Sequence, residues 1–464
     1  MYNIPYGHLN HRKKNDSKLL LIIISSLLFY FASVLSTSNL VNIFAIIFLV
    51  YTSTQLIMYR QGGWIFLLYA FGISSALAAN AIIELTGSYL IEIAEHAYVT
   101  GSAARNAFLS AFFMACTLLF YKKILKIIPH PPTLGSLEKF THRALLILAT
   151  ATPLVLIACF ALYGTPLLMG MSRFDYILSS APEAYRSIYT LIPYLSLMIS
   201  LAGKCNIIKQ KTSNIWFLVF VVIMILSSEK FSLMFLSFFF FVLPKYVLSG
   251  EGVSKKHLLK FSIFVVAIFG AILLNYFIIT GSIEIFLPRI ALQGQMPYAL
   301  DKISGDFKDL NVIFQSFFGF TSDEADRGIY YLMAKIAPAT LVSRMLDAGI
   351  TLTAPFPANF TYFFGFILAP FFVAIHAAFT GFSCAVLYKS IAQKNFFLTA
   401  VSVMIFFMTY LATTMGKIEK MFSPLMLTCL ISLFLYYTLV PKLKAQKKHK
   451  HFEPLTTLNQ PPSK

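Results

Sequence analysis

Charged residues are scarce in this sequence. Asp, Glu, Lys and Arg together make up 12% of the 464 residues, whereas 58% are hydrophobic. An ordinary soluble domain carries roughly 25% charged residues. Apolar runs of about 20 residues, the length that crosses a bilayer as a helix, begin at Leu19 and recur almost to the C-terminus. The composition therefore predicts an all-α polytopic integral membrane protein. The runs do not alternate polar and apolar residues, which excludes lipid-facing strands.

The short motifs of soluble enzymes are also missing. The sequence contains no GxxxxGK[ST], GxSxG or HExxH pattern, which excludes ATP hydrolysis at a phosphate-binding loop and the common serine and zinc hydrolases. The five cysteines form no CxxC pair, so neither a disulfide framework nor a thiolate metal site is predicted. We expect no metal and no cofactor. The net charge of +18 does not predict nucleic-acid binding, because most of the charges lie in short loops between apolar runs.

Hydropathy predicts about twelve transmembrane helices. The predicted spans cover residues 19–35, 40–58, 64–85, 107–121, 144–163, 187–203, 214–228, 231–248, 261–279, 359–388, 396–411 and 421–440. If both termini are cytoplasmic, about 25 of the 37 Lys and Arg residues lie on the cytoplasmic side and about 15 of the 19 acidic residues do not. This bias predicts a multi-pass membrane protein with both termini in the cytoplasm.

The spans divide the chain into five parts. These are a cytoplasmic N-terminus (1–18), spans one to nine (19–279), a large periplasmic loop (280–358), spans ten to twelve (359–440) and a basic cytoplasmic tail (441–464). We expect the tail to lie on anionic lipid. Long loops usually carry function, and this one mixes charged, aliphatic and aromatic residues, which predicts short amphipathic helices on the membrane surface.

Within that loop, the string "TSDEADRG" has two interpretations. Thr321 lies three residues before Glu324, a capping-box spacing that predicts a helix starting there. The alternative is a divalent-cation site, because carboxylates are its ligand type. The capped helix is the favoured interpretation.

Several cationic residues lie on the non-cytoplasmic side, against the charge gradient. They are Arg173, Arg186, Arg289, Arg327 and Arg344, together with Lys230 in a turn between two spans. The planar fork of arginine suits phosphate oxygens, so several arginines around one cavity would bind a pyrophosphate and stabilise it as a leaving group.

Each of these residues also has a purely structural interpretation. Arg186 lies at the start of a predicted span and would anchor at the headgroups. Arg344 would pair with Asp347 on one helix face, and Lys230 with its neighbour Glu229. Arg173 follows a helix end broken by glycine and proline, which favours a functional role.

We assign the candidate residues to two sets. The predicted catalytic set is Arg173, Arg289, Asp175 and Glu229; the predicted binding set for pyrophosphate and glycan is Arg327, Arg344, Lys230, Tyr176 and Lys417. Asp323 is a third candidate for the carboxylate that accepts a proton. Tyrosines could stack on sugars, although at membrane depth they are more often interfacial. Lys417 lies in "KIEK", which could also be a solvated hairpin tip, and His376 is favoured as a satisfied interior histidine.

The order of these parts resembles a known family. "YGTPLLMGMSRFDY" follows span five, "SSEKFSLMFL" joins two adjacent spans, and "PFPANFTYFFGFILAPFF" leads from the long loop into span ten. Over most of the chain this is similar to the O-antigen polymerase (Wzy-type) and oligosaccharide repeat-unit polymerase family of bacterial inner-membrane proteins. One departure is that some members carry arginine-to-glycine motifs in two periplasmic loops, and neither Arg173 nor Arg289 has a glycine at the corresponding distance.

The resemblance implies a GT-C-like, metal-independent glycosyltransferase with a periplasmic active site. Its donor would be a growing glycan on undecaprenyl pyrophosphate, and its acceptor the non-reducing-end hydroxyl of one repeat unit on a second carrier. Block transfer would lengthen the polysaccharide of lipopolysaccharide. The implied partners are these lipid-linked oligosaccharides, membrane lipids, a chain-length regulator and a flippase.

Two other functions fit the same plan of spans. An O-antigen ligase shares the spans and the long loop but transfers finished glycan to a lipid core. A lipid-linked oligosaccharide flippase or another secondary transporter would show two related halves with interrupted helices. We find no such repeat, and the unusual charges lie in the loops of one face, which favours an enzyme.

Overall fold

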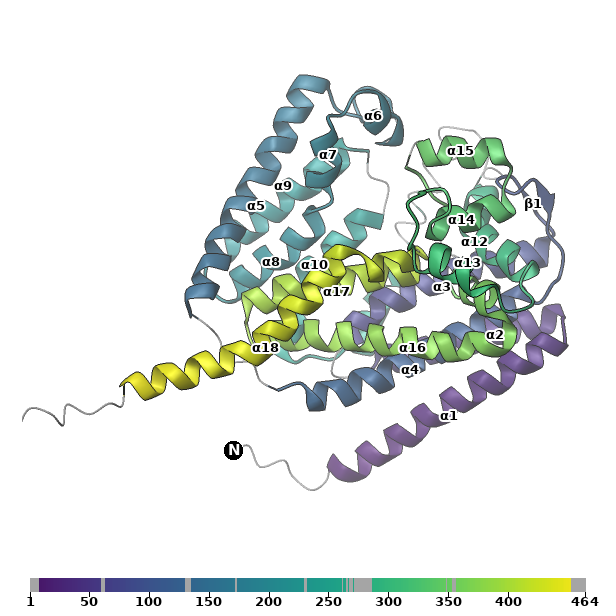
Figure 1. Ribbon diagram of the computed structural model, residues 1–464, viewed down its shortest axis with the longest axis horizontal. Coiled ribbons are helices and arrows are strands. Elements are labelled where there is room, and N and C mark those ends of the chain that lie inside the picture. Colours follow the sequence, from purple (N-terminus) through teal and green to yellow (C-terminus); the bar gives the residue numbers. More distant parts are fainter. Residues whose placement is uncertain are drawn as a thin grey trace, which may run out of the picture.

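The computed structural model describes residues 8–451 except for a few gaps. The gaps are 60–62, 130–134, 172, 229–231, 348 and 353–355, and between 261 and 285 only 262–263, 266 and 270 are described. Within these residues the chain is almost entirely helical (Figure 1). Among the described residues, eight helices are long and apolar enough to cross a membrane. The all-α membrane fold is confirmed at this level.

The helices fall into a long class and a short class. The long ones are α1 (His8–Leu35), α2 (Asn39–Ile57), α3 (Gly63–Thr86), α4 (Ser102–Ile127), α5 (Gly135–Tyr163), α16 (Ala358–Ala392), α17 (Phe396–Thr414) and α18 (Pro424–His451). The short ones are α6 (Arg173–Ser179), α7 (Glu183–Tyr189), α8 (Ile192–Lys204), α9 (Gln210–Leu226), α10 (Ser232–Ser249), α12 (Phe286–Lys302), α13 (Leu310–Val312), α14 (Gly328–Ile336) and α15 (Ala339–Asp347), with a π-helical turn η1 (Ile313–Phe317) and a 3-10 turn η2 (Ile418–Phe422). A hairpin pairs β1 (Tyr89–Leu90) with β2 (Glu95–His96).

Polar residues define where several of these helices start. Ser38 Oγ accepts the Val41 N–H at the start of α2, and Asn395 Oδ1 accepts the Leu398 N–H at 2.9 Å at the start of α17. Such N-caps satisfy backbone donors that the first helical turn leaves open. Between the caps the apolar runs are helical because a helix pairs its own backbone groups without water.

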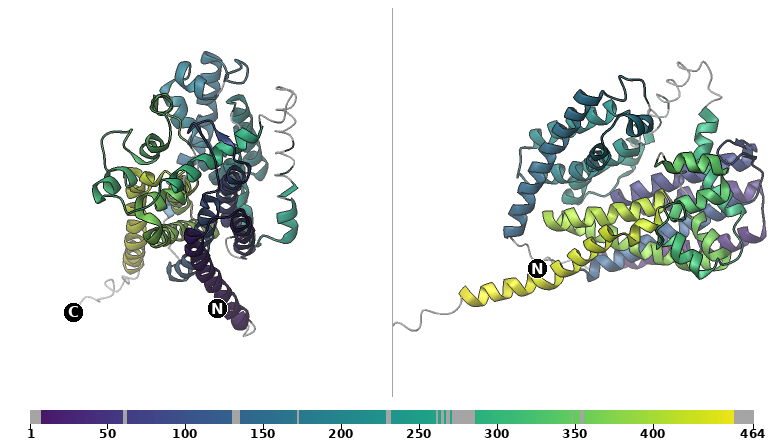
Figure 2. Two further views of the ribbon diagram at one scale, coloured as in Figure 1. Left: turned by 90° about the vertical axis from the view of Figure 1, so that its right-hand side faces the viewer. Right: turned by 45° about the horizontal axis from the view of Figure 1, so that its top comes forward.

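The helices form two groups. One contains α5 and α7 to α10, at the upper left of Figure 1; the other contains α1 to α4, α12 and α16. Helix α17 packs against helices of both groups, and α18 projects away from the bundle at its C-terminal end (Figure 2).

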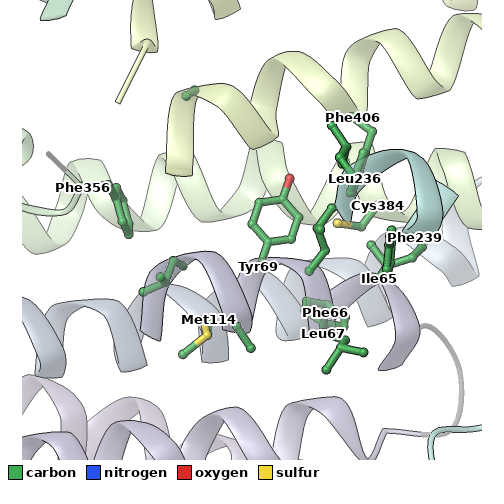
Figure 3. Close-up of a cluster of buried hydrophobic side chains, with 14 of the residues drawn as sticks. Ile65, Phe66, Leu67, Tyr69, Met114, Leu236, Phe239, Phe356, Cys384 and Phe406 are labelled. Atoms are coloured by element: carbon green, nitrogen blue, oxygen red, sulfur yellow. The ribbon is translucent and has the colours of Figure 1, made fainter. Parts of the chain in front are cut away.

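The main hydrophobic core lies where the two groups meet. Figure 3 shows side chains of α3, α4, α10, α16 and α17 facing one another, among them Leu236, Cys384 and Phe406. The hydroxyl of Tyr69 lies 3.3 Å from Thr409 Oγ1 of α17, so the polar end of this buried ring has a partner. Mostly aromatic and aliphatic packing therefore joins the groups.

The prediction of about twelve spans is wrong for the described chain. Predicted spans 214–228 and 231–248 correspond to α9 and α10, which are apolar but shorter than the long class. Predicted span 187–203 is divided between α7 and α8 at Thr190 and Leu191, and predicted span 261–279 lies largely outside the described residues. Apolar content alone does not report where a backbone stops being helical.

Helix α16 contains a break at Gly365. Its φ of 67° and ψ of 169° are not helical, and a Cβ here would lie 2.7 Å from the Gly305 carbonyl oxygen. Two carbonyls near the break have no partner within the helix, because Gly365 interrupts the helical backbone and because Pro370 has no N–H for the Phe366 carbonyl, and both are satisfied from outside. The Phe363 carbonyl accepts the Lys308 N–H at 2.9 Å, and the Phe366 carbonyl accepts the Tyr30 hydroxyl at 2.9 Å. Glycine thus lets the preceding loop approach the helix closely.

The segment 280–358 carries short helices, as predicted, but they do not all lie on a surface. Helix α12 packs against α3, α4 and α16, and its residues Met296, Tyr298 and Asp301 are buried. A Cβ on Gly294 would lie 2.4 Å from the Asn80 backbone nitrogen of α3. This contact shows that α12 is part of the bundle.

Candidate functional site

A fully paired set of charges joins α12 to the bundle. Arg105 of α4 forms an ion pair with Asp301 of α12, with Nε 3.0 Å from Oδ2, and both side chains are buried. The same guanidinium donates to the Thr100 carbonyl at 2.8 Å and to the Ser33 carbonyl at 3.3 Å. A buried arginine is tolerated when its donors are used in this way.

Glu84 completes this paired set at the N-terminus of α4. Its carboxylate accepts backbone N–H groups from Thr100 at 2.8 Å, Ser102 at 3.1 Å and Ala103 at 3.2 Å, and the side-chain amide of Asn42 at 2.7 Å. These are the donors that a helix start leaves open, where a negative charge is also favoured. We call Glu84, Arg105 and Asp301 the paired network.

A second group of charges gathers around the turn η2, between α17 and α18. Lys417 and Glu419 are largely enclosed and interact electrostatically with each other and with Lys420, and Arg327 of the α14 N-cap acts on Glu419. Arg186 of α7 acts on Lys417 as well. We call Arg186, Arg327, Lys417 and Lys420 the cationic cluster, with Glu419 in its midst.

The cationic cluster is incompletely paired. Within the described residues, Arg327 Nε and Glu419 Oε2 are buried and neither has a hydrogen-bond partner. Arg327 uses another nitrogen to donate to the Thr321 carbonyl. Unsatisfied buried groups of this kind are costly, and in native proteins they often mark a site that is completed by a ligand.

Three glycines in the long loop make room for these charges. A Cβ on Gly328 would lie 2.3 Å from Glu419 Oε2, and one on Gly319 would lie 2.6 Å from the Glu419 Cβ and 3.2 Å from the Arg327 Cγ. A Cβ on Gly349 would lie 2.8 Å from an Arg186 nitrogen. All three have positive φ, so their backbone conformation also favours glycine.

Burial shifts the pKa of the enclosed groups. It raises the pKa of Glu419 above its ordinary value, and the neighbouring Lys420, Lys417 and Arg327 oppose that rise. Burial also lowers the pKa of Lys417, an effect that Glu419 opposes. Opposed shifts of this kind are frequent at functional sites.

An apolar cavity of about 340 Å³ extends to Met415, two residues before Lys417 of the cluster. It is lined by α3, α10 and α17, with Gln293 of α12 and with Thr414 and Met415 at the end of α17. The α-carbons of Met415 and Lys417 are less than about 8 Å apart, because only two peptide units join them. The volume falls in the range of ligand pockets, about 300 to 1,000 Å³.

The structure brings only part of the predicted site together. Arg327 and Lys417 lie in the cationic cluster, as expected, whereas Arg344 is exposed on α15. Arg186, which we expected to anchor at headgroups, donates to the Gly349 carbonyl at 3.4 Å and belongs to the cluster. The remaining predicted residues lie outside the described side chains: Arg173, Asp175, Glu229, Lys230 and Arg289.

Three local predictions are corrected. Tyr176 does not offer a face for stacking, because it is buried and its hydroxyl donates to the Gly164 carbonyl at 3.0 Å. No helix starts at Thr321. Asp323 Oδ1 instead accepts the Ala325 N–H at 2.9 Å, a local turn that delays the helix until Gly328. The turn at Lys417 is not a solvated tip, since the long loop covers it.

The prediction that His376 is a satisfied interior residue is confirmed. His376 is an interior histidine whose Nε2 lies 2.9 Å from Thr413 Oγ1. Among the residues that the structure describes, no group of His, Cys, Asp and Glu has the arrangement of a metal site.

Sequence reasoning missed Arg105, Asp301 and Glu419. Arg105 could have been noticed, since it precedes a predicted span on the side where positive charge is rare. Asp301 and Glu419 carry no comparable signal, because their partners are distant in the sequence.

Residues 322–430 match a protein family described only as a family of unknown function, DUF6418. The matched stretch contains Arg327, Lys417, Glu419 and Lys420 but not Arg186. No curated protein and no solved structure matches the chain.

Chemically, the cluster can bind an anion with several charges. Arginine supplies a fork of donors and lysine a compact charge, and both are favourable partners of phosphate oxygens. Glu419 can accept a proton. The apolar cavity next to them can take a hydrocarbon chain.

Proposed function

We propose that this protein is a membrane-embedded glycosyltransferase that polymerises oligosaccharide repeat units carried on undecaprenyl pyrophosphate. It would act at the periplasmic face of a bacterial inner membrane, in the synthesis of lipopolysaccharide or another surface polysaccharide. The observation that carries this proposal is that Met415, which lines the apolar cavity, lies two residues before Lys417 of the incompletely paired cationic cluster. A polyprenyl pyrophosphate has the complementary chemistry, an anion joined to a long hydrocarbon.

The cluster would act on the donor. Arg327, Lys417 and Lys420 would bind the pyrophosphate and stabilise the charge that develops as it leaves the sugar. Arg186 would contribute from α7, across the junction between the two helix groups. The cavity would hold the first part of the polyprenyl chain.

The resemblance described above supports the choice of polymerisation over other reactions of lipid-linked sugars. The loop between the predicted spans nine and ten, a feature of the resemblance, supplies Arg327 and the glycines that enclose Glu419. A chain-length regulator and a flippase would be its partners.

The test is extension of a lipid-linked repeat unit by the purified protein in nanodiscs. We expect the wild type to produce a ladder of products on a gel and Arg327→Ala to reduce its rate by about 10²- to 10³-fold, the usual effect of removing one charge-stabilising donor. Arg143→Ala is the matched control, because Arg143 is an exposed arginine of α5 outside the cluster. Equal rates for Arg327→Ala and Arg143→Ala would refute the role of the cluster.

A deletion strain separates the proposed activity from its rivals. Loss of the polymerase leaves the lipid core bearing a single repeat unit. Loss of a ligase leaves bare core with polymer still on its carrier, and loss of a flippase leaves repeat units on the cytoplasmic side. Either of the last two results would replace the proposed reaction.

A further inference from the structure

The sequence offers Asp175, Glu229 and Asp323 as acceptors for the proton of the attacking hydroxyl, and the structure offers a better group. Asp323 is exposed, and its carboxylate is engaged in a local turn. Asp175 and Glu229 lie outside the described side chains. The remaining carboxylate at the cationic cluster that is enclosed and has an oxygen to spare is Glu419.

We propose that Glu419 is the catalytic base of this protein and that Arg327 holds the departing pyrophosphate beside it. This proposal rests on the proposed function. The hydroxyl oxygen of the acceptor sugar would form a bond to the anomeric carbon of the donor while its proton passes to Glu419 Oε2. The bond between the anomeric carbon and the pyrophosphate oxygen would break, and its electron pair would leave with the lipid pyrophosphate.

The geometry around Glu419 suits both halves of this step. Oε2 faces the Gly328 backbone and accepts no hydrogen bond within the described chain, so an arriving hydroxyl would supply the missing donor. Arg327 Nε likewise has no acceptor, and a phosphate oxygen would supply one. Both side chains flank Gly319, since a Cβ there would lie 2.6 Å from the Glu419 Cβ and 3.2 Å from the Arg327 Cγ, so the two side chains are neighbours. Catalytic hydrogen bonds are often completed only when substrate is bound.

The charged groups around Glu419 also suit its role as a general base. Lys417 and Lys420 of η2 and Arg327 of α14 favour its ionised form, while burial disfavours that form and raises its pKa. Tyr330 of α14 lies within electrostatic range and remains neutral at the pH of the reaction. A carboxylate whose pKa is raised in this way is a stronger proton acceptor than an exposed one.

The experiment measures turnover and donor binding of the full chain in nanodiscs, with undecaprenyl-pyrophosphate-linked repeat unit as donor and acceptor. For Glu419→Gln we expect kcat to fall by about 10²- to 10⁴-fold, the contribution of a positioned base, while the donor KM changes less than about threefold. Asp326→Asn is the matched control, since it removes an exposed carboxylate next to Arg327 and should keep wild-type kcat.

The pH profile adds a readout that a structural role would not change. The wild-type rate should decline as the pH falls through the raised pKa of Glu419, and this acid limb should disappear in Glu419→Gln. Glu419→Asp keeps a carboxylate and should recover part of the rate with an acid limb, which shows that the turn folds.

Three results overturn the proposal. A Glu419→Gln protein with wild-type kcat, or with an unchanged acid limb, shows that another group takes the proton while the glycosyltransferase function stands. A rise in donor KM with unchanged kcat makes Glu419 a binding residue. A wild-type protein that extends no lipid-linked glycan, although the same preparation is folded, refutes the proposed function itself.

Discussion

The paired network is a group of buried charges, whereas the cationic cluster combines the enclosed Lys417 and Glu419 with the exposed Arg186 and Lys420, and the two groups differ in how their donors and acceptors are used. In the paired network, Arg105 binds Asp301 and two carbonyls, and Glu84 accepts four hydrogen bonds from backbone and amide donors. In the cationic cluster, Arg327 Nε and Glu419 Oε2 lack partners. The difference indicates that the first group holds the helices together, whereas the second leaves buried groups unsatisfied, as the ligand site proposed above requires.

The largest effect that would test this contrast is loss of the Asp301 charge. Asp301→Asn leaves the Arg105 guanidinium buried without a counter-ion, which costs about 3 to 5 kcal/mol in comparable cases. We expect the variant to unfold at a much lower temperature in detergent, as followed by intrinsic fluorescence. The double variant Arg105→Met with Asp301→Leu removes both charges and should recover most of the stability. A single variant as stable as the wild type would show that the network is not a structural connection.

A smaller effect is expected where the loop encloses Glu419. Gly328→Ala places a methyl group against Glu419 Oε2 and forces alanine to adopt a positive φ, so we expect a loss of about 1 to 3 kcal/mol. Gly170→Ala is the matched control, because Gly170 also has positive φ but its added methyl group would meet no atom within 4 Å. The difference between the two unfolding free energies isolates the steric term. If both variants lose the same amount, the close packing over Glu419 is not as described.

The smallest expected effect concerns Glu92, an acidic residue that is not part of the paired network. Glu92 is half-buried in the β1–β2 hairpin, and burial raises its pKa to about 7. The folded state binds a proton on the Glu92 carboxylate more tightly than the unfolded chain does. The free energy of unfolding that Glu92 contributes is therefore lost as the pH rises from about 4.5 to above 7. Glu92→Gln should therefore raise the Tm at pH 8 and leave it unchanged at pH 4.5.

The neighbouring Glu95 gives the opposite sign and serves as the control. Its carboxylate lies 2.7 Å from Lys302 Nζ, and this hydrogen bond raises the pKa of Lys302. Glu95→Gln should lower the Tm at pH 8. The same sign for Glu92→Gln and Glu95→Gln would contradict the assignment of a penalty to Glu92.

The sequence predicted those helices whose apolar runs end at polar or glycine residues. The predicted span 40–58 matches α2 (Asn39–Ile57), and 64–85 matches α3 (Gly63–Thr86). It failed where a break is decided by packing, as at the division of span 187–203 into α7 and α8. Periodicity reports the environment of a residue but not the backbone turns between neighbouring helices.

The candidate site was predicted only in part for a related reason. The surplus of positive charge on one side identified Arg327, and Lys417 followed from its place on the same side. Glu419 was part of an apparent hairpin tip, and its enclosure depends on Gly319 and Gly328, about 90 to 100 residues earlier in the chain. The pairing of Arg105 with Asp301 joins residues 196 positions apart, which no local pattern encodes.

That separation has a consequence for synthesis at the ribosome. Translation proceeds at about 5 to 20 residues per second, so Asp301 follows Arg105 into the membrane by about 10 to 40 seconds. During this interval, the nascent chain carries an arginine at the end of α4 without its carboxylate. A newly inserted N-terminal half is therefore an unfinished intermediate, and the arrival of α12 is the step that completes it by pairing this arginine.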